Sequence, residues 1–494
     1  MKRISKAISL ILAVLTLFAL SACGDSYQDA IIYFEIPEQP YTLDPQTAST
    51  DSELAIVNNI FEGLLRKNAS GSIVCGASES FTYNNLTYTF KLREDAVWSN
   101  EEPLTADDFV FALRRAVSPE TKAPFASRLF PIENARDIYE GKKSADTLGV
   151  TAPDGHTVII KLAYEDENFE EALTTSVAMP CNQKFFEEAG GKYGLSSEYI
   201  ISCGSYKLTK WNKESFGIRL YSNSLYLGTF AAKNAAVYIT KDKDESAIER
   251  LIGNNVDIAF IDSSLTDTAH ESGLKTIDYQ NICWFLTISS DFSEDLRKSL
   301  AMLVGSEVYG GNLKTGYTPA DSIFPAAVNE NTGSSGMTFY NPEAGKALFA
   351  KETAKLAEKK FPSGVKLYYY DNGVIKPVIT DIVGHWQNNL GAFVNIEGVD
   401  SAEKLVPELK NRTLDMAVFP VRADSPDIEE YLSNFGVQAN GQSPSDIQTA
   451  VLKSSGIFPI AFQNTTIAYS PALSDVFTRF GNGYIDFSFI VKTE

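Results

Sequence analysis

Two segments far apart in the chain follow the same plan, and this repetition limits the fold more than any other feature. In each segment a short predicted helix, around residues 245–252 or 405–409, and a turn precede an apolar strand with Asp at its second position. The strands are residues 256–261 (VDIAFI) and 414–419 (LDMAVF). Alternating helices and apolar strands are typical of α/β proteins, so we expect two α/β lobes of comparable construction.

Periodicity predicts further helices and strands between these segments. Residues 54–65 place Leu54, Val57, Phe61, Leu64 and Leu65 on one helical face. Residues 86–92 alternate as in a half-buried strand. One helix is expected to begin after Thr105, an N-cap followed closely by two aspartates, and another to include residues 378–390, where apolar side chains recur every four positions. Asp154-Gly155 predicts a turn between two short strands.

The first 22 residues are predicted to be a secretory signal peptide. A basic start is followed by an apolar run from Ile8 to Leu20 and by small residues. The run is shorter than the roughly 20 residues that a spanning helix needs; a short anchor that stays in place is the alternative. Residues 20–23 (LSAC) resemble the lipobox of bacterial lipoproteins. This resemblance implies that Cys23 carries a lipid and that the mature chain is anchored on the extracytoplasmic face of the cell membrane.

Charge and length exclude some classes of partner. A formal net charge of −20 over 494 residues opposes binding to nucleic acid, which depends on neutralising phosphates. It also opposes a polybasic contact with lipid, so we expect attachment to the membrane through the lipid anchor only. The chain is long enough for two or three domains.

No motif for catalysis, metal or cofactor binding stands out. His156, His270 and His385 are isolated from one another and from any Glu-x-x-His spacing. A nucleophile elbow, a P-loop and a dinucleotide fingerprint are all missing from the sequence. The acidic run at 241–245 mixes charges of both signs and lacks the later residues of a calcium loop. We therefore expect a protein that is not an enzyme and holds no cofactor.

Four cysteines follow Cys23, at positions 75, 181, 203 and 283. None belongs to a Cys-x-x-Cys pair, and they are too sparse for a disulfide scaffold. Export permits disulfides without requiring them, so a bond between Cys181 and Cys203, on either side of a predicted helix, is left open.

Short motifs recur in a fixed order along nearly the whole mature chain. They are LDP at 43–45, FEGLL at 61–65, YTFKLR at 88–93, VWSN at 97–100, LTADDF at 104–109, APFAS at 123–127, GSYKL at 204–208 and YIDF at 484–487. In this order they resemble the peptide- and nickel-binding proteins of ABC importers (solute-binding family 5). The segment at 123–127 resembles the oligopeptide-binding branch in particular.

This resemblance implies an α/β fold: a bilobed clamshell of the periplasmic-binding-protein type (type II) with an accessory α+β domain inserted in lobe I. Lobe I is expected at 24–59, 178–283 and 466–494, the accessory domain at 60–177 and lobe II at 284–465. A peptide would be held between the lobes by backbone hydrogen bonds, much like an added strand. The lobes would close on it about a hinge.

The resemblance also implies a set of ligand-binding residues. Residues 422–427 (RADSPD) line up with the family segment whose aspartate pairs with the α-amine of the ligand. Asp424 is therefore the expected anchor, and Arg422 and Ala423 are expected to bind the ligand beside it. The alternative is that Asp424 only caps a following helix. Phe125 aligns with an aromatic residue of the peptide groove, although a core role fits equally well. Thr50 and Asp51 fall in an early loop that offers backbone groups to the ligand.

The chain departs from the family pattern in two places. Arg422, next to Ala423, stands where peptide binders often carry a cysteine whose partner matches Cys283, so that disulfide is expected to be missing. Arg422 could instead favour an anionic ligand or face solvent. Between Phe435 and Pro459 the chain is shorter than the family pattern, which thins lobe II and leaves the length of a bound peptide open.

Together these features predict the binding subunit of an ABC importer. It would be a monomer that captures short peptides and delivers them to a membrane permease and its ATPase. Two alternatives are a surface interaction or signalling lipoprotein without transport, and a family member that binds a non-peptide solute such as a nickel chelate. The scattered histidines oppose direct coordination of a metal by imidazole.

Overall fold

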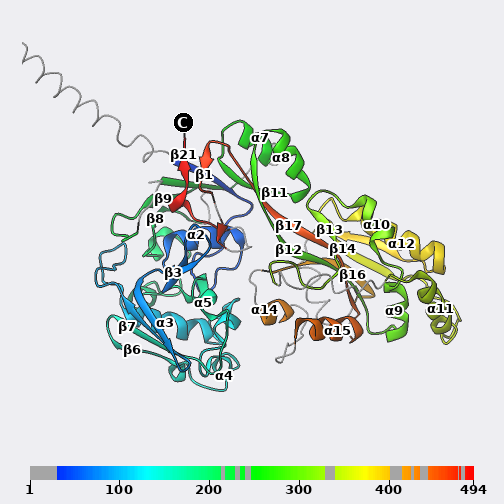
Figure 1. The fold of residues 1–494 in the computed structure, drawn as a ribbon, viewed down its shortest axis with the longest axis horizontal. Helices are drawn as coiled ribbons and strands as arrows, with labels where there is room; N and C mark the ends of the chain where they lie inside the picture. The colour runs from blue at the N-terminus through cyan, green and yellow to red at the C-terminus, as the bar shows by residue number, and fades with distance from the viewer. Residues whose placement is uncertain are drawn as a thin grey trace, which may run out of the picture.

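The computed structural model describes residues 31–212, 217–228, 234–239, 246–328, 340–400, 414–423, 428–433, 443–454, 456–476, 478–479 and 484–493. They form two bodies joined by the long strands β12 (Lys275–Ile288) and β17 (Ile457–Tyr469), which cross the centre of the molecule (Figure 1). We call the body that holds strand β1 (Ile31–Ile36) the first lobe and the opposite body the second lobe. The α/β, bilobed fold predicted from the sequence is confirmed.

One sheet of eleven strands passes through both lobes. From the second lobe to the first its order is β15 (Asn395–Val399), β14 (Lys366–Tyr370), β16 (Met416–Arg422), β12, β17, β11 (Ile258–Ile261), β1, β10 (Asn234–Ile239), β9 (Gly217–Ser222) and β8 (Tyr206–Lys210), with β13 (Tyr317–Pro319) also on β17. The lobes are therefore connected by a continuous ladder of backbone hydrogen bonds.

The point where the ladder passes from one lobe to the other is marked by an irregularity in β12. Residues 275–280 of β12 pair with 464–469 of β17, which also pairs with β11 in the first lobe. Beyond a register shift between Gln280 and Ile282, β12 pairs with β16 of the second lobe as well. A bulge bends a strand and interrupts its ladder, so this shift is where the connection between the lobes can flex.

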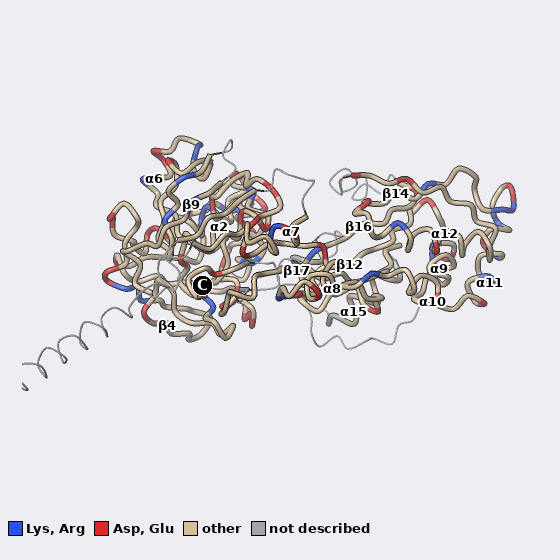
Figure 2. Tube along the Cα trace, turned by 90° about the horizontal axis from the view of Figure 1, so that it is seen from above, with Lys and Arg blue, Asp and Glu red and all other residues tan. Residues whose placement is uncertain are grey.

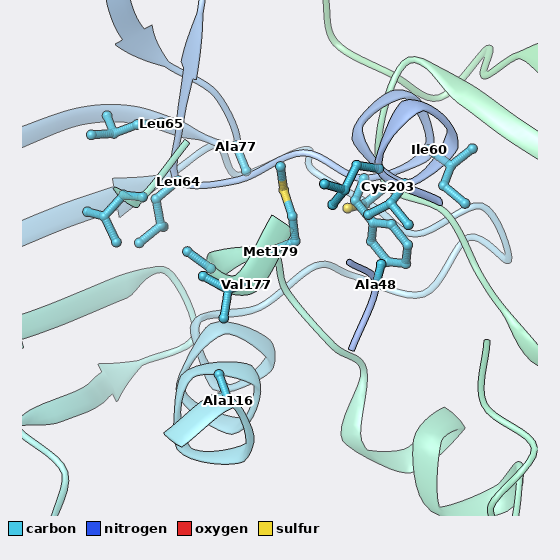
Figure 3. Packing of buried hydrophobic residues seen from close by; sticks show 14 of the residues in the cluster. Ala48, Ile60, Leu64, Leu65, Ala77, Ala116, Val177, Met179 and Cys203 are labelled. Atoms are coloured by element: carbon cyan, nitrogen blue, oxygen red, sulfur yellow. The ribbon is translucent and has the colours of Figure 1, made fainter. Parts of the chain in front are cut away.

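The first lobe carries a second sheet and the largest hydrophobic core. Its four antiparallel strands are β4 (Ser78–Asn84), β5 (Thr87–Leu92), β7 (Thr157–Lys161) and β6 (Val150–Asp154). Helices α2 (Asp51–Ile60) and α3 (Ala106–Val117) pack with both sheets into one apolar cluster, part of which is seen around Met179, Val177 and Ala116 in Figure 3. The limits predicted for lobe I and the accessory domain stay predictions.

The second lobe has cores of its own on the two faces of its part of the sheet. One cluster includes residues of α9 (Glu294–Ala301), α10 (Ser306–Tyr309), α11 (Pro342–Thr353) and α12 (Lys376–Leu390). The other includes α14 (Ile428–Ser433) and α15 (Pro444–Ser454), which lie below the sheet in the view of Figure 1, with α14 nearer to the first lobe. Because separate clusters stabilise the two lobes, they can move as units about β12 and β17.

The repeated aspartates of the two apolar strands have the same structural role. Asp257, directly before β11, accepts a hydrogen bond from the Tyr33 backbone N–H of the parallel neighbour β1, at 2.8 Å. Asp415, directly before β16, accepts one from the Lys366 backbone N–H of its parallel neighbour β14, at 3.1 Å. In each lobe this side chain satisfies a backbone donor where a parallel strand pair begins.

Most elements predicted from periodicity are present, and one is wrong in extent. Strand 86–92, the helix after Thr105, the turn at Asp154-Gly155 and helix 378–390 correspond to β5, α3, the β6–β7 hairpin and α12. Helix 54–65, in contrast, ends at Ile60. The Ile60 carbonyl accepts the backbone N–H groups of Cys203 and Gly204 at 3.0 and 2.9 Å, and residues 61–64 leave the helix.

Several expectations fall outside the described residues: the signal peptide, Cys23, the run at 241–245 and helix 405–409. Cys75, Cys181, Cys203 and Cys283 are free thiols, so the bond left open between Cys181 and Cys203 does not form. In the part of the chain that the structure describes, no helix is both long and apolar enough to cross a membrane.

A buried ion pair explains the LDP motif. The carboxylate of Asp44 is contacted at both oxygens by the guanidinium of Arg115 on α3, with 2.9 Å between Oδ1 and Nη1. The two side chains are only 6% and 10% exposed. The guanidinium also lies over the Phe186 ring, 4.3 Å from its centroid. The pair therefore fixes the segment before α2 onto α3.

We predict that Asp44→Ala lowers the free energy of unfolding by about 3 to 5 kcal/mol, because removing one partner leaves a buried charge without compensation. Urea unfolding followed by circular dichroism measures the loss. Glu133→Ala is the matched control, since Glu133 pairs with Lys161 at the surface and such pairs contribute about 1 kcal/mol or less. Equal losses in the two variants would contradict this account of the motif.

Candidate functional site

The segment expected to offer backbone groups to a ligand is the N-terminal cap of α2. The Thr50 N–H donates to a Glu53 carboxylate oxygen at 3.1 Å, and its carbonyl accepts the Leu54 N–H at 2.9 Å. The Thr50 hydroxyl in turn accepts the Glu53 N–H at 3.3 Å, completing a capping box. Thr50 therefore uses its backbone groups within the helix, and its contact with a ligand stays a prediction.

Asp51 and Arg422 meet across the space between the lobes. Asp51 is the first residue of α2 in the first lobe, and Arg422 is the last residue of β16 in the second. The guanidinium contacts both carboxylate oxygens, with 2.5 Å between Nη2 and Oδ1. The side chains are 14% and 27% exposed. Arg422 is thus paired with the opposite lobe, which answers the question whether it faces solvent.

The residue after Arg422 is fixed to the connection between the lobes. Ala423 is buried, and its N–H donates to the carbonyl of Asn281 at 2.7 Å, at the register shift of β12. Asp424, the expected amine anchor, lies with residues 425–427 outside the described part of the chain. The role of Asp424 therefore stays a prediction. The described residues on either side in the chain are Ala423 and the first residue of α14.

Phe125 is a core residue in this structure. It belongs to the apolar cluster of the first lobe, and the guanidinium of Arg128 lies over its ring, 4.3 Å from the centroid. It directly precedes the 3-10 helix η2 (Ala126–Leu129), against which α14 of the second lobe lies. The lobes therefore approach each other here too, close to Phe125, although its contact with a ligand is still a prediction.

Two residues of β12 near the contact between the lobes, Tyr279 and Asn281, carry no signal in the sequence. Tyr279 has a buried hydroxyl for which the described residues supply no hydrogen-bond partner. Burial, and then the negative charges of Asp278 and Asp51, raise the pKa of Tyr279 above its ordinary value, so the phenol stays protonated. Asn281 is fully buried and accepts the Thr465 hydroxyl of β17 at 2.8 Å. Nothing in the local pattern distinguishes these residues from the rest of a long strand.

These groups are suited to binding. A carboxylate, a guanidinium and a buried phenolic hydroxyl lie together where the lobes meet, beside the strands that join them. Among the residues the structure describes, no three His, Cys, Asp or Glu side chains gather in a way that could hold a metal ion. Acidic and basic residues are interspersed along the described trace of both lobes (Figure 2).

Two cavities lie away from the cleft. One of about 420 Å³ is in the second lobe, bordered by Asp291, Glu352 and Lys355 among others. The other lies in the first lobe beside Glu62 and Arg66. Neither is lined by Asp51, Tyr279 or Arg422, so neither belongs to the site between the lobes.

The sequence matches the family described as bacterial extracellular solute-binding proteins, family 5 (middle), over residues 77–443. A dipeptide-binding protein of Lactococcus lactis subsp. cremoris is 25% identical over 472 residues, which cover 88% of this chain and 84% of that protein. The solved structure of Haemophilus influenzae OppA in complex with RPPGFSPFR superposes with a TM-score of 0.78 at 20% identity, over 95% of this chain and 100% of that one.

Two structures of the murein tripeptide-binding protein MppA bear on the arrangement of the lobes. Each is 19% identical to this chain and covers 94% of it; they cover 99% and 97% of their own chains. The TM-score is 0.77 for the Escherichia coli MppA structure and 0.68 for the structure titled as the unliganded open form. Both likenesses support the bilobed fold of this chain.

We predict that Tyr279→Phe leaves the fold at least as stable but weakens ligand binding. A buried hydroxyl without a partner carries a desolvation cost, so its removal should stabilise the unliganded protein by about 1 kcal/mol. If a ligand atom satisfies the hydroxyl, the same change lowers ligand affinity. The control for binding is Tyr193→Phe, which removes another buried hydroxyl, beside the Cys181 thiol and next to α6 (Gln183–Glu188), away from the contact between the lobes.

Thermal unfolding and titration calorimetry measure the two effects separately. Tyr279→Phe should unfold at the wild-type temperature or slightly above it and should bind ligand more weakly, whereas Tyr193→Phe should keep the wild-type affinity. Unchanged affinity in Tyr279→Phe would show that its hydroxyl does not meet the ligand.

Proposed function

This chain belongs to family 5 of the bacterial extracellular solute-binding proteins, and we propose that it is the lipid-anchored binding subunit of an ABC importer for short peptides. The observation that carries the proposal is the likeness over 95% of the chain to a binding protein solved with a peptide, combined with two lobes that meet across polar groups. The dipeptide-binding relative from L. lactis supports the same class of ligand.

The geometry suits capture of a ligand by closure. The lobes have separate cores and are joined by two strands whose pairing is interrupted at Gln280 and Ile282. A ligand between them is buried when they close, and its main-chain groups can then pair as an added strand does. Since every peptide has the same main chain, such contacts support broad specificity.

In this proposal the carboxylate of Asp424 binds the α-ammonium group of the peptide. A carboxylate and an ammonium group about 4 Å apart interact by about 4 kcal/mol at an effective dielectric constant of about 20. Tyr279 supplies a further polar contact. Asp51 and Arg422 neutralise each other's charge where the lobes meet, so a ligand there meets no net charge from this pair.

The proposal also includes export, attachment to the membrane and delivery of the ligand. Residues 1–22 direct export, and a lipid on Cys23 holds the protein at the extracytoplasmic face of the membrane, where a short peptide would be passed to a permease driven by an ATPase. We propose that the subunit acts as a monomer and catalyses no reaction.

Native mass spectrometry of the lipid-free mature domain, purified without unfolding, tests the proposed function. We predict that it carries short peptides, identified by sequencing what is released, and that Asp424→Ala loses at least 90% of them. Asp427→Ala, which removes a carboxylate from the same segment, is the matched control and should retain them.

Two outcomes would contradict the proposal. One is a protein that carries no peptide and gains no thermal stability from a mixed pool of di- to pentapeptides. The other is capture of a non-peptide solute, such as a metal chelate, in preference to that pool. Retention of peptides by both aspartate variants would contradict only the role of Asp424.

A further inference from the structure

The ion pair between Asp51 and Arg422 differs from most other ion pairs of the structure in what it joins. Lys67 and Glu171, for example, are 2.9 Å apart and of similar burial, but both belong to the first lobe. Their distance does not change when the lobes move. The distance between Asp51 and Arg422 does change, because one residue begins α2 and the other ends β16.

The position of the pair relative to the connecting strands makes it sensitive to this motion. Arg422 is paired with Ile282 in the ladder between β16 and β12, directly beyond the register shift. Its backbone is therefore held at the edge of the second lobe, while Asp51 is held by the capped N-terminus of α2 in the first. Rotation of the lobes about the register shift in β12 therefore moves the backbone of Asp51 away from that of Arg422.

The ion pair between Asp51 and Arg422 is bidentate, which makes it strong for a partly exposed pair. Both guanidinium nitrogens at the end of Arg422 contact both oxygens of Asp51, which is the bidentate arrangement with the best directionality for a carboxylate. The carboxylate also sits in the first turn of α2, where the helix dipole favours a negative charge.

We propose that Asp51 and Arg422 are positioning residues for ligand capture: their ion pair holds the lobes together in the absence of ligand and has to break before a ligand can enter. An interaction made only in the closed arrangement shifts the population toward that arrangement by its own free energy. For a bidentate pair of this exposure we expect a shift of about fivefold in the ratio of closed to open protein.

The pair has a defined consequence for ligand exchange. A ligand that enters through the open form associates at a rate proportional to the open fraction, and it leaves when the closed complex opens. Loss of the ion pair should therefore accelerate both association and dissociation. A damaged binding site would not do this, because it would slow association or leave it unchanged. This inference concerns closure itself and does not depend on the identity of the ligand.

Distances between two spin labels, measured by pulsed electron paramagnetic resonance on the unliganded protein, test the proposal. Glu120→Cys and Ser445→Cys provide exposed labelling positions in the first and second lobe, in a background where the half-buried Cys75 is replaced by Ser. The wild-type protein should show mainly one short distance. Asp51→Asn and Arg422→Gln should each increase the fraction at longer distance about fivefold.

Two controls separate the ion pair from a general disturbance. The exchanged pair Asp51→Arg with Arg422→Asp should restore the short distance, since it restores the attraction with reversed charges. Lys67→Gln, in the ion pair within the first lobe, should leave the distances at their wild-type values.

The proposal is overturned if both single variants keep the wild-type distances, or if they open the protein and the exchanged pair fails to close it. If a variant does not fold, the wild-type protein in 1 M NaCl decides the question. Salt at this concentration shortens the screening length to about 3 Å, so the long-distance fraction should rise toward that of the single variants. Distances unchanged by salt would then contradict the proposal.

Discussion

The pairing of β12 with β17 is the interaction on which the rest of the molecule depends. These strands are the only part of the described sheet that reaches into both lobes, and every other strand of that sheet joins the ladder on one side or the other. Backbone hydrogen bonds fix the register of the two strands, and the paired strands therefore hold the lobes next to each other. The interruption at Gln280 and Ile282 nevertheless allows the two halves to change their angle.

The site follows from this connection. Three residues lie together where the lobes meet: Asp51 at the start of α2, Arg422 at the end of β16 and Tyr279 within β12. Since they are supplied by different lobes, the site is complete only when the lobes are together. The proposed binding and closure would then be one process, and the proposed role of the ion pair is to bias it before a ligand arrives.

Local pattern predicted those parts of the structure that local interactions determine. The repeated aspartates stand out in the sequence at the second position of each predicted apolar strand. In the structure each lies directly before its strand and accepts a backbone N–H from the parallel neighbour. The extent of the helix at 54–65 was wrong because its end depends on residues 203 and 204, whose N–H groups meet the Ile60 carbonyl. A Cβ on Gly204 would lie 2.7 Å from the Phe61 carbonyl oxygen, which explains the glycine of the GSYKL motif.

The site itself was predictable only in part. Resemblance to the family drew attention to Asp51 and Arg422 separately, yet their pairing joins residues 371 positions apart and no spacing rule connects them. Tyr279 has no signal in the sequence, because its importance comes from a buried hydroxyl left without a described partner by the surrounding fold.

The most direct test of the account is a crystal structure of the protein purified without unfolding, with whatever ligand it retains. The account predicts electron density for a short extended peptide between the lobes, on the floor formed by β12 and β17, with Asp51 and Arg422 still in contact. A ligand bound in one of the cavities within a single lobe, with the cleft between the lobes empty, would contradict it.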